Sequence, residues 1–352
     1  ELGGFDITTA NGTFAVASQY TITSNSSVTP TTQNWNFTAT FINLDTDQGE
    51  NAGKKMDAEI IIQQNELKPT LAEYIISQYT GTDGENDLYY HDADLANSAG
   101  DNSYRYAGAS SSVNNYVCFG SDASPCPSAN LYRIIGVFGS EVKLIKNTSY
   151  GSYAWETDWS TQGNTWNSST KPDIYTTLNT TFLNTLSSTW QNKIATHSYE
   201  VGGGTNANIR YYPNGIPANA YRNEVGANQT GYAESMKIGL MYVSDYYYGA
   251  SPTYWTYPGY TSSSYPDANG NSGSSYDYRA ATGSNWMYLG SSEWTISRIL
   301  DGSDSAFRVD STGYVNVTSV NFARAVRPVF YLTSSISYVS GSGSSADPMR
   351  IN

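Results

Sequence analysis

The chain holds two histidines among its 352 residues, His91 in the segment HDAD and His197 in THSYE. Histidine is the commonest general acid–base group and a common metal ligand, so these two settings bear on whether a catalytic site is expected. They lie far apart in the sequence, and neither stands in a GxSxG or HExxH context. His91 beside Asp92 and Asp94 is either a metal ligand or a loop histidine satisfied by hydrogen bonds, and we expect the second. The sequence predicts a protein that is not an enzyme.

Carboxylates offer a second basis for a metal site. The stretch LDTDQGENAGKK contains Asp45 and Asp47 and suits calcium in its oxygen ligands, yet it lacks the terminal bidentate glutamate of a twelve-residue calcium loop. A solvated hairpin tip is the expected structure there. Asp301 and Asp304 in LDGSDS have three interpretations: paired carboxylates, calcium ligands, or parts of a polar turn. The polar turn is favoured. No cofactor is predicted, and calcium stays an alternative.

The segment 245–278, DYYYGASPTYWTYPGYTSSSYPDANGNSGSSYDY, has the composition of evolved binding loops. In such loops tyrosine and tryptophan supply rigid contact area, and serine, glycine and asparagine supply adaptable hydrogen bonds. The alternative is that the rings stack on one another and cap a loop-rich domain. The predicted ligand-binding anchors are the aromatic residues Tyr246, Tyr247, Tyr248, Tyr254, Trp255, Tyr257 and Tyr260.

A second predicted contact surface lies in the segment 294–332, which holds two apolar runs, AFRV and AVRPVFYL. Alternation divides inward from outward side chains there. The predicted core residues are Ala306, Phe307, Val309, Val326, Val329 and Tyr331. The residues predicted to face a ligand are Arg298, Asp301, Ser303, Asp304, Tyr314, Asn316, Thr318, Ser319, Asn321, Phe322 and Arg324. Arg308 and Arg327 stand inside the apolar runs, where a charge needs a partner, so both are expected in buried salt bridges.

The sequence pattern of the segments that hold these side chains predicts an α+β, β-rich fold in two domains. Residues 1–66 alternate as antiparallel strands of a small β-sandwich, which serves as a stalk or assembly domain. The expected elements of the domain 67–352 are a helix over 70–79 capped by Thr70, a hairpin over 131–146 that turns at Gly139, a helix over 171–194, a weaker helix over 218–226, and strands over 237–244, 293–299, 305–309 and 325–333.

Charge and cysteine content narrow the range of partners. The net charge of −13 repels the phosphate backbone, so nucleic acid is not an expected partner. No run approaches the roughly 18 apolar residues that span a bilayer, so membrane insertion is not expected either. Cys118 and Cys126 lie in the short loop CFGSDASPC, where a disulfide is expected over free buried thiols. An extracellular location follows from that disulfide.

Several blocks of the chain carry a resemblance to a known family. TLAEYIISQY, NYVCFGSDASPCPSANLYRIIGVFGSEVKLIK, KIGLMYVSDY, WTISR, AVRPVFYL and the ending SGSGSSADPMRIN resemble secreted or cell-surface proteins of gut Firmicutes. In that family such a module follows a domain similar to the TasA/camelysin β-sandwich. The module also resembles C-type-lectin-like and formylglycine-generating-enzyme-like folds, with short sheets, two or three helices and long loops. In several of those families the segment between a block like Trp294 and one like Arg327-Pro328 is diversified by retroelements, which the resemblance implies as a possibility here.

Together these features predict a bacterial surface binding protein, an adhesin that recognises a host or microbial glycan or protein. The alternative is a structural subunit of a surface fibre or pilus, assembled through the N-terminal β-domain by strand exchange.

Overall fold

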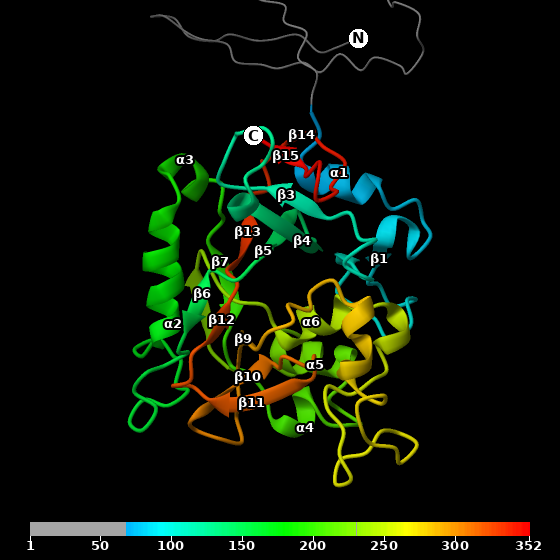
Figure 1. Ribbon diagram of the computed structural model, residues 1–352, viewed down its shortest axis with the longest axis vertical. Helices are drawn as coiled ribbons and strands as arrows, with labels where there is room; N and C mark the ends of the chain where they lie inside the picture. Colours follow the sequence, from blue (N-terminus) through cyan, green and yellow to red (C-terminus); the bar gives the residue numbers. More distant parts are fainter. Residues whose placement is uncertain (1–67, 230) are drawn as a thin grey trace, which may run out of the picture. The chain divides into compact units, whose positions relative to one another are not determined.

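The computed structural model describes residues 68–229 and 231–352, which build an α+β, β-rich fold (Figure 1). The fold class predicted from the sequence is confirmed. The predicted β-sandwich over residues 1–66, with the stretch that holds Asp45 and Asp47, lies outside the described residues. Among the described residues, no helix has both the length and the apolarity needed to cross a membrane.

A six-stranded antiparallel sheet occupies the upper half of Figure 1. Its order is β1 (Leu88–Tyr90), β2 (Tyr104–Tyr106), β4 (Leu131–Phe138), β5 (Glu141–Lys146) and β13 (Val329–Leu332), and β3 (Tyr116–Cys118) also pairs with β4. The predicted hairpin is confirmed as β4 and β5. Gly139 takes a φ of +62° in its turn, a conformation that favours glycine.

A five-stranded sheet forms the lower half. Its order is β11 (Val315–Ser319), β10 (Ser305–Val309), β9 (Glu293–Arg298), β12 (Arg324–Val326) and β6 (Gly151–Tyr153). The predicted strand over 325–333 is therefore two strands, β12 and β13, in different sheets. They separate at Pro328, which has no N–H to give to a ladder, and the Arg327 guanidinium turns back there onto Glu293 of β9.

The core residues predicted in this region are confirmed, because all six are at most 5% exposed: Ala306, Phe307, Val309, Val326, Val329 and Tyr331. Arg327 forms the expected buried ion pair, with Nε and Nη2 at 2.7 and 2.6 Å from the Glu293 carboxylate oxygens. Arg308 pairs with Asp310 at 2.5 Å and stays partly accessible. The sequence did not predict β11, which pairs antiparallel with β10 and whose polar residues hide its alternation.

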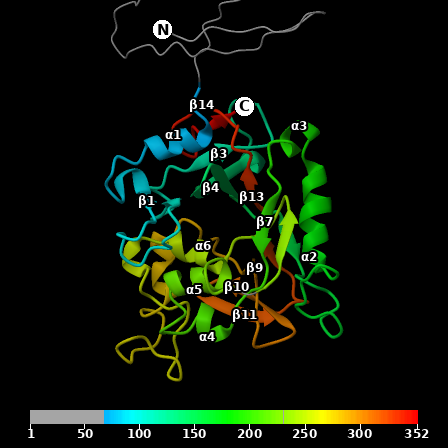
Figure 2. The ribbon, with the colours of Figure 1, turned by 180° about the vertical axis from the view of Figure 1, so that it is seen from behind.

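Short helices fill the space around the sheets. They are α1 (Leu71–Ser77), α2 (Asp173–Thr176), α3 (Ser188–Gln191), α4 (Asn206–Ile209), α5 (Pro217–Glu224) and α6 (Val243–Tyr248). The predicted helix over 171–194 is α2 and α3 joined by a π-helical turn, Thr177–Phe182, and a 3₁₀ turn, Leu183–Thr185. This column runs along one side of both sheets (Figures 1 and 2). Two-stranded sheets pair β7 (His197–Glu200) with β8 (Ala233–Met236), and β14 (Tyr338–Ser340) with β15 (Arg350–Ile351).

Helix termini show how the local sequence sets these bounds. Thr70 and Glu73 form a reciprocal capping box at the start of α1, as the threonine predicted. The strand expected over 237–244 does not form: the segment is largely buried, but within the described residues it makes an isolated bridge from Gly239 to Val329, and α6 begins at Val243. The Glu224 carboxylate accepts the backbone N–H groups of Val243 and Ser244 at 3.0 and 2.8 Å, and this capping replaces strand pairing.

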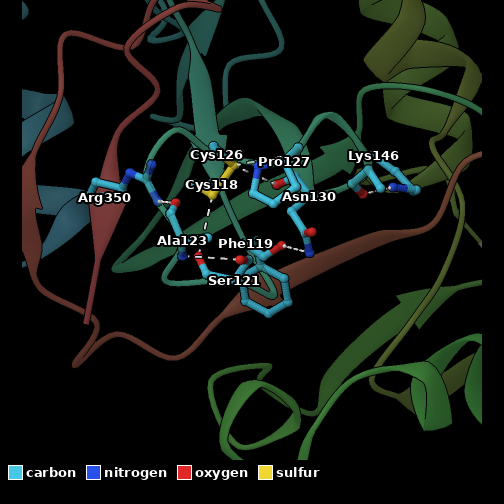
Figure 3. Close-up of a disulfide and its surroundings, with 10 residues drawn as sticks. Cys118, Phe119, Ser121, Ala123, Cys126, Pro127, Asn130, Lys146 and Arg350 are labelled. Atoms are coloured by element: carbon cyan, nitrogen blue, oxygen red, sulfur yellow. Dashed lines mark hydrogen bonds between the residues drawn. A yellow bond between two sulfur atoms is a disulfide. The ribbon is translucent and has the colours of Figure 1, made fainter.

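The predicted disulfide is confirmed between Cys118 and Cys126 (Figure 3). It closes the loop that follows β3. The Arg350 guanidinium donates from Nη1 to the Ala123 carbonyl at 2.8 Å, which ties β15 at the chain end to this loop. The Asn130 side chain donates to the Phe119 carbonyl at 3.0 Å and holds the other side.

Candidate binding surface

Four of the predicted aromatic anchors are buried. Tyr246, Tyr247, Tyr248 and Trp255 are at most 1% exposed, so the prediction that they contact a ligand is wrong. Three of these residues lie on α6, and the hydroxyl or indole N–H of each finds a backbone carbonyl inside the fold. Because a buried ring with a satisfied polar tip stabilises a core, these side chains fold inward. The alternative interpretation, rings that cap a loop-rich domain, is correct for them.

The other three anchors stay half-exposed. Tyr254 packs edge-on against Tyr257, with ring centroids 5.2 Å apart. Tyr260 instead approaches Tyr314 from the second predicted surface, with centroids 5.1 Å apart. Two regions that are distant in sequence therefore meet at Tyr260.

None of the residues predicted to face a ligand between Arg298 and Arg324 is buried, but they do not form one patch. Tyr314 and Asn316 lie at the start of β11, and Asn321 and Phe322 follow its end, with β11 spanning roughly 17 Å between them. Phe322 is 51% exposed beside the Arg324 guanidinium. The remaining polar residues of this predicted set lie near the C-terminal end of β11: Arg298, Asp301, Ser303, Asp304, Thr318 and Ser319.

Asp301 and Asp304 each accept a hydrogen bond from another group of the fold. Asp301 accepts the backbone N–H of Asn206 at 3.1 Å, and Asp304 accepts the Ser305 hydroxyl at 3.0 Å. The Ser305 bond fits the polar turn that the sequence favoured, whereas the Asn206 bond joins Asp301 to the start of α4. Within 68–229 and 231–352, no group of three or more His, Cys, Asp or Glu side chains is placed to hold a metal ion.

The start of β11 belongs to a cluster that we call the tyrosine–arginine surface: Arg210, Tyr211, Tyr260, Tyr265, Arg279 and Tyr314. Its members come from the end of α4, the loop and the 3₁₀ helix Tyr278–Ser284 between α6 and β9, and the turn before β11. These segments lie at the same end of the fold in both ribbon views (Figures 1 and 2). Tyr265 is 46% exposed and stacks on Tyr211 with centroids 3.8 Å apart and an interplanar angle of 2°.

Backbone hydrogen bonds fix these three segments to one another. Tyr260 N–H donates to the Arg210 carbonyl at 3.0 Å, and Val315 N–H donates to the Gly259 carbonyl at 3.0 Å. Gly259 is required here, because a Cβ would lie 1.9 Å from the Tyr247 hydroxyl oxygen. The buried Tyr247 therefore supports the surface from beneath, although it does not belong to it.

Two guanidinium groups lie among the rings. Arg210 Cζ lies 4.7 and 4.8 Å from the ring centroids of Tyr211 and Tyr260, and Arg279 Cζ lies 5.3 Å from that of Tyr314. All three distances are within the range of cation–π attraction. The hydrogen bond to Asp277 raises the pKa of Arg279, whereas burial lowers the pKa of Arg210. Burial also raises the pKa values of Tyr211 and Tyr314, so both hydroxyls remain hydrogen-bond donors at neutral pH.

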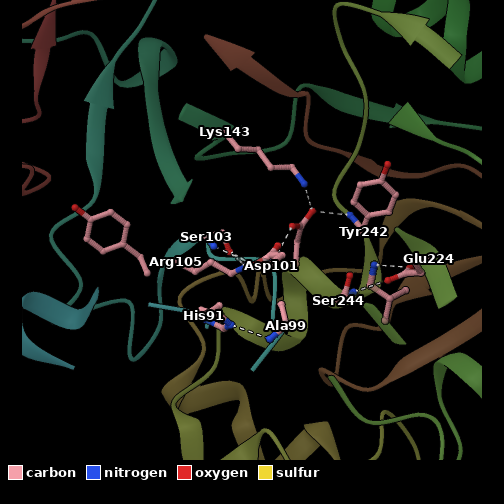
Figure 4. A network of polar contacts seen from close by, with 12 residues as sticks. His91, Ala99, Asp101, Ser103, Arg105, Lys143, Glu224, Tyr242 and Ser244 are labelled. Carbon is pink, nitrogen blue, oxygen red and sulfur yellow. Dashed lines mark hydrogen bonds and ion pairs between the residues drawn. The ribbon is translucent and has the colours of Figure 1, made fainter. Parts of the chain in front are cut away.

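Another set of perturbed ionisable groups forms a buried network between the six-stranded sheet and α6 (Figure 4). Lys143 Nζ lies 2.5 Å from Asp245 Oδ2, and Arg105 bonds to Asp101 at 2.5 Å while approaching Asp245 at 3.8 Å. Burial lowers the pKa of Lys143 against the opposing effect of Asp245, and burial raises the pKa of Glu224. Lys143 and Asp245 are at most 2% exposed, so this network holds α6 in place and is closed to a substrate.

His91 belongs to the same buried region. It is fully buried, and its Nδ1 accepts the Ala99 backbone N–H at 3.1 Å, so the expected hydrogen-bonded loop histidine is correct in part. Its ring packs edge-on against Tyr248 with centroids 4.6 Å apart. Burial lowers the pKa of His91 well below its usual range, and the Arg105 charge lowers it further. Sequence reasoning missed the burial, because HDAD reads as a polar loop.

A cleft of about 560 Å³ lies beside the disulfide, between its loop and the β14–β15 pair. Its lining includes Ser121, Asp122, Trp190, Asp347 and Arg350. The Arg350 guanidinium already donates a hydrogen bond to the Ala123 carbonyl, and Trp190 is mostly buried. The cleft offers fewer free aromatic faces than the tyrosine–arginine surface does.

Sequence reasoning missed four members of the surface: Arg210, Tyr211, Tyr265 and Arg279. Tyr265 lies inside the aromatic segment but was not singled out. Arg210 and Tyr211 stand in IRYYPNG, where neighbouring arginine and tyrosine residues precede a Pro-Asn-Gly turn. That combination is the one local signal that would have indicated an exposed aromatic and cationic corner.

No protein-family model matches the chain, and neither a curated protein nor a solved structure does so. The class of protein must therefore be argued from the surface itself.

Proposed function

We propose that the chain is an extracellular, surface-displayed bacterial binding protein, an adhesin that recognises a host or microbial glycan or protein through the tyrosine–arginine surface. The observation that carries the proposal is the convergence of four tyrosine rings and two guanidinium groups, from three chain segments, on a rigid backbone. Tyrosine and arginine are the side chains that most often dominate binding energy at recognition surfaces.

The surface is suited to noncovalent capture. Flat ring faces cover the apolar face of a sugar or a peptide side chain, and the guanidinium and hydroxyl groups supply directional donors. Since backbone hydrogen bonds already fix the three segments, they lose little conformational entropy when a ligand binds. A binding module without catalytic chemistry is our proposal for the whole described domain.

The Cys118–Cys126 disulfide supports the extracellular location, because disulfides persist in oxidising compartments. The resemblance to surface proteins with C-type-lectin-like modules agrees with this proposal and remains part of it.

A glycan and protein array tests the proposal. Wild type is compared with a Tyr260→Ala/Tyr265→Ala/Tyr314→Ala variant, whose side chains are half-exposed or exposed. We expect wild type to bind a subset of the array and the variant to lose that binding, with unfolding temperature little changed.

The matched control is Trp159→Ala, which removes a 49% exposed aromatic side chain from the loop before α2. It should bind as wild type does. Loss of binding in Phe322→Ala, with the triple variant unaffected, would place recognition at the far end of β11 and overturn the site.

A further inference from the structure

Arg210 is a buried cation without a carboxylate partner among the described residues. Arg210 is 5% exposed, and burial is the main cause that lowers its pKa. The Asp301 carboxylate bonds to the Asn206 backbone instead. A buried charge without a counter-ion is costly, so it requires an explanation.

Two other buried arginines show what a satisfied guanidinium looks like in this chain. Arg133 donates from Nε, Nη1 and Nη2 to Asn115, Ser110 and the Val113 carbonyl. Arg327 places its Nε–Nη2 edge on the Glu293 carboxylate at 2.7 and 2.6 Å, the bidentate geometry that matches a carboxylate.

The same edge of Arg210 carries no acceptor from residues 68–229 or 231–352. Nη1 donates to Asn316 Oδ1 at 3.0 Å and to Asn206 Oδ1 at 3.4 Å. Nε is buried from solvent and has no hydrogen-bond acceptor among the described residues. Nη2 makes no hydrogen bond to the described residues, and it is not among their buried atoms. Nη2 is therefore the unpartnered nitrogen that solvent still reaches, and it is a donor without an acceptor among the described residues.

The rings beside this edge indicate what carries the carboxylate. Tyr265 lies flat on Tyr211, and Tyr211 and Tyr260 flank the guanidinium. A six-membered sugar ring covers a flat aromatic face with its C–H groups while a substituent reaches the cation. Arg279 cannot serve in the same way, because its guanidinium is used on Asp277.

We propose that Nη2 of Arg210 is the anion subsite of the tyrosine–arginine surface, and that it takes the carboxylate of an acidic sugar, a uronic or a sialic acid. This rests on the proposed function and adds the ligand class to it. The carboxylate supplies the acceptor that Nη2 lacks, while the sugar ring packs on the tyrosines.

The test compares probes that differ in the carboxylate. Methyl glucuronide, N-acetylneuraminate, methyl glucoside and N-acetylglutamate amide are titrated into the whole chain, and the Arg210 Nε–H signal is followed by NMR. We expect the acidic sugars to bind about 10- to 100-fold more tightly than the glucoside and to shift that signal, as hydrogen bonds to a charged partner do.

Asn316→Asp is the decisive variant. It is isosteric and places a carboxylate on Arg210 Nη1, at the atom that already accepts at 3.0 Å. Arg210 then has an internal counter-ion, so the preference for acidic sugars should fall to about the glucoside level while the fold is kept. Arg210→Gln should give the same loss if it folds.

Several results would overturn the inference. Equal binding of glucuronide and glucoside, or a preference that survives Asn316→Asp, removes the anion subsite and leaves the binding surface intact. Tighter binding of N-acetylglutamate amide than of either acidic sugar would show that the ligand of this subsite is an acidic peptide and not a sugar. An empty array, with no probe shifting the Arg210 signal, contradicts the proposed function as well.

Discussion

Replacing Lys143 by methionine should destabilise the fold through the Asp245 carboxylate that it leaves behind. Methionine keeps most of the side-chain volume and the contacts with the surrounding rings of Phe138, Tyr242 and Tyr331. What is lost is the ammonium group 2.5 Å from Asp245 Oδ2, at a site that is 1% exposed.

The magnitude follows from what remains around Asp245. Removing one partner of a buried ion pair costs about 3–5 kcal/mol, because the other charge stays desolvated. Arg105 remains 3.8 Å away, and the Tyr242 N–H still donates at 2.9 Å, so we expect the lower end, about 3 kcal/mol. That is roughly a 100-fold change in the unfolding equilibrium. A Lys143→Met/Asp245→Asn double variant should cost less than the sum of its single changes.

Urea unfolding at neutral pH measures these free energies. Lys171→Met is the matched control, because Lys171 forms its 2.7 Å ion pair with Glu234 while 34% exposed, where solvent screening limits the loss to about 1 kcal/mol or less. If Lys143→Met destabilised the chain no more than Lys171→Met, the buried network would not hold α6 and the reasoning would be refuted.

Three further predictions follow from burial and connectivity. The folded state disfavours protonation of His91, whose pKa lies well below 6.5, so stability should fall as pH drops from 6.5, by up to about 1.4 kcal/mol per pH unit. His91→Asn keeps the acceptor for Ala99 and should flatten this dependence in urea unfolding at pH 7.5 and 5.5; an unchanged slope would contradict the assignment. Replacing Cys118 and Cys126 by serine opens a loop with a sequence separation of 8 and should cost about 2.5 kcal/mol in the same assay, with no measurable cost being the contrary result. Tyr247→Ala should cost about 3–5 kcal/mol, as for a large core side chain, whereas exposed Tyr265→Ala should change unfolding by less than about 1 kcal/mol; similar costs would show that the surface and core assignments are wrong.

Local pattern was sufficient for much of the fold. The Thr70 cap, the hairpin at Gly139, the core positions of β10 and β13, and the burial of Arg327 in an ion pair each depend on neighbouring residues or on a strong burial rule, and each was predicted. The split at Pro328 was missed because it depends on two sheets that the sequence does not show separately.

The candidate site was harder, because composition does not say which face of an aromatic segment is covered. Tyr247 and Tyr260 belong to the same tyrosine-rich stretch, yet one supports the core and the other reaches solvent. The difference arises from α6, whose start depends on a cap by Glu224 from an earlier helix. Arg210 reaches the surface through tertiary contacts with Tyr260 and Asn316 that no local pattern indicates.

A crystal structure of the chain with the tightest acidic-sugar ligand from the array tests the central claim most directly. The account predicts the ligand ring against Tyr260 and Tyr265 and its carboxylate on Nη2 of Arg210. Ligand bound instead in the cleft beside the disulfide, or at Phe322 beyond β11, would contradict it.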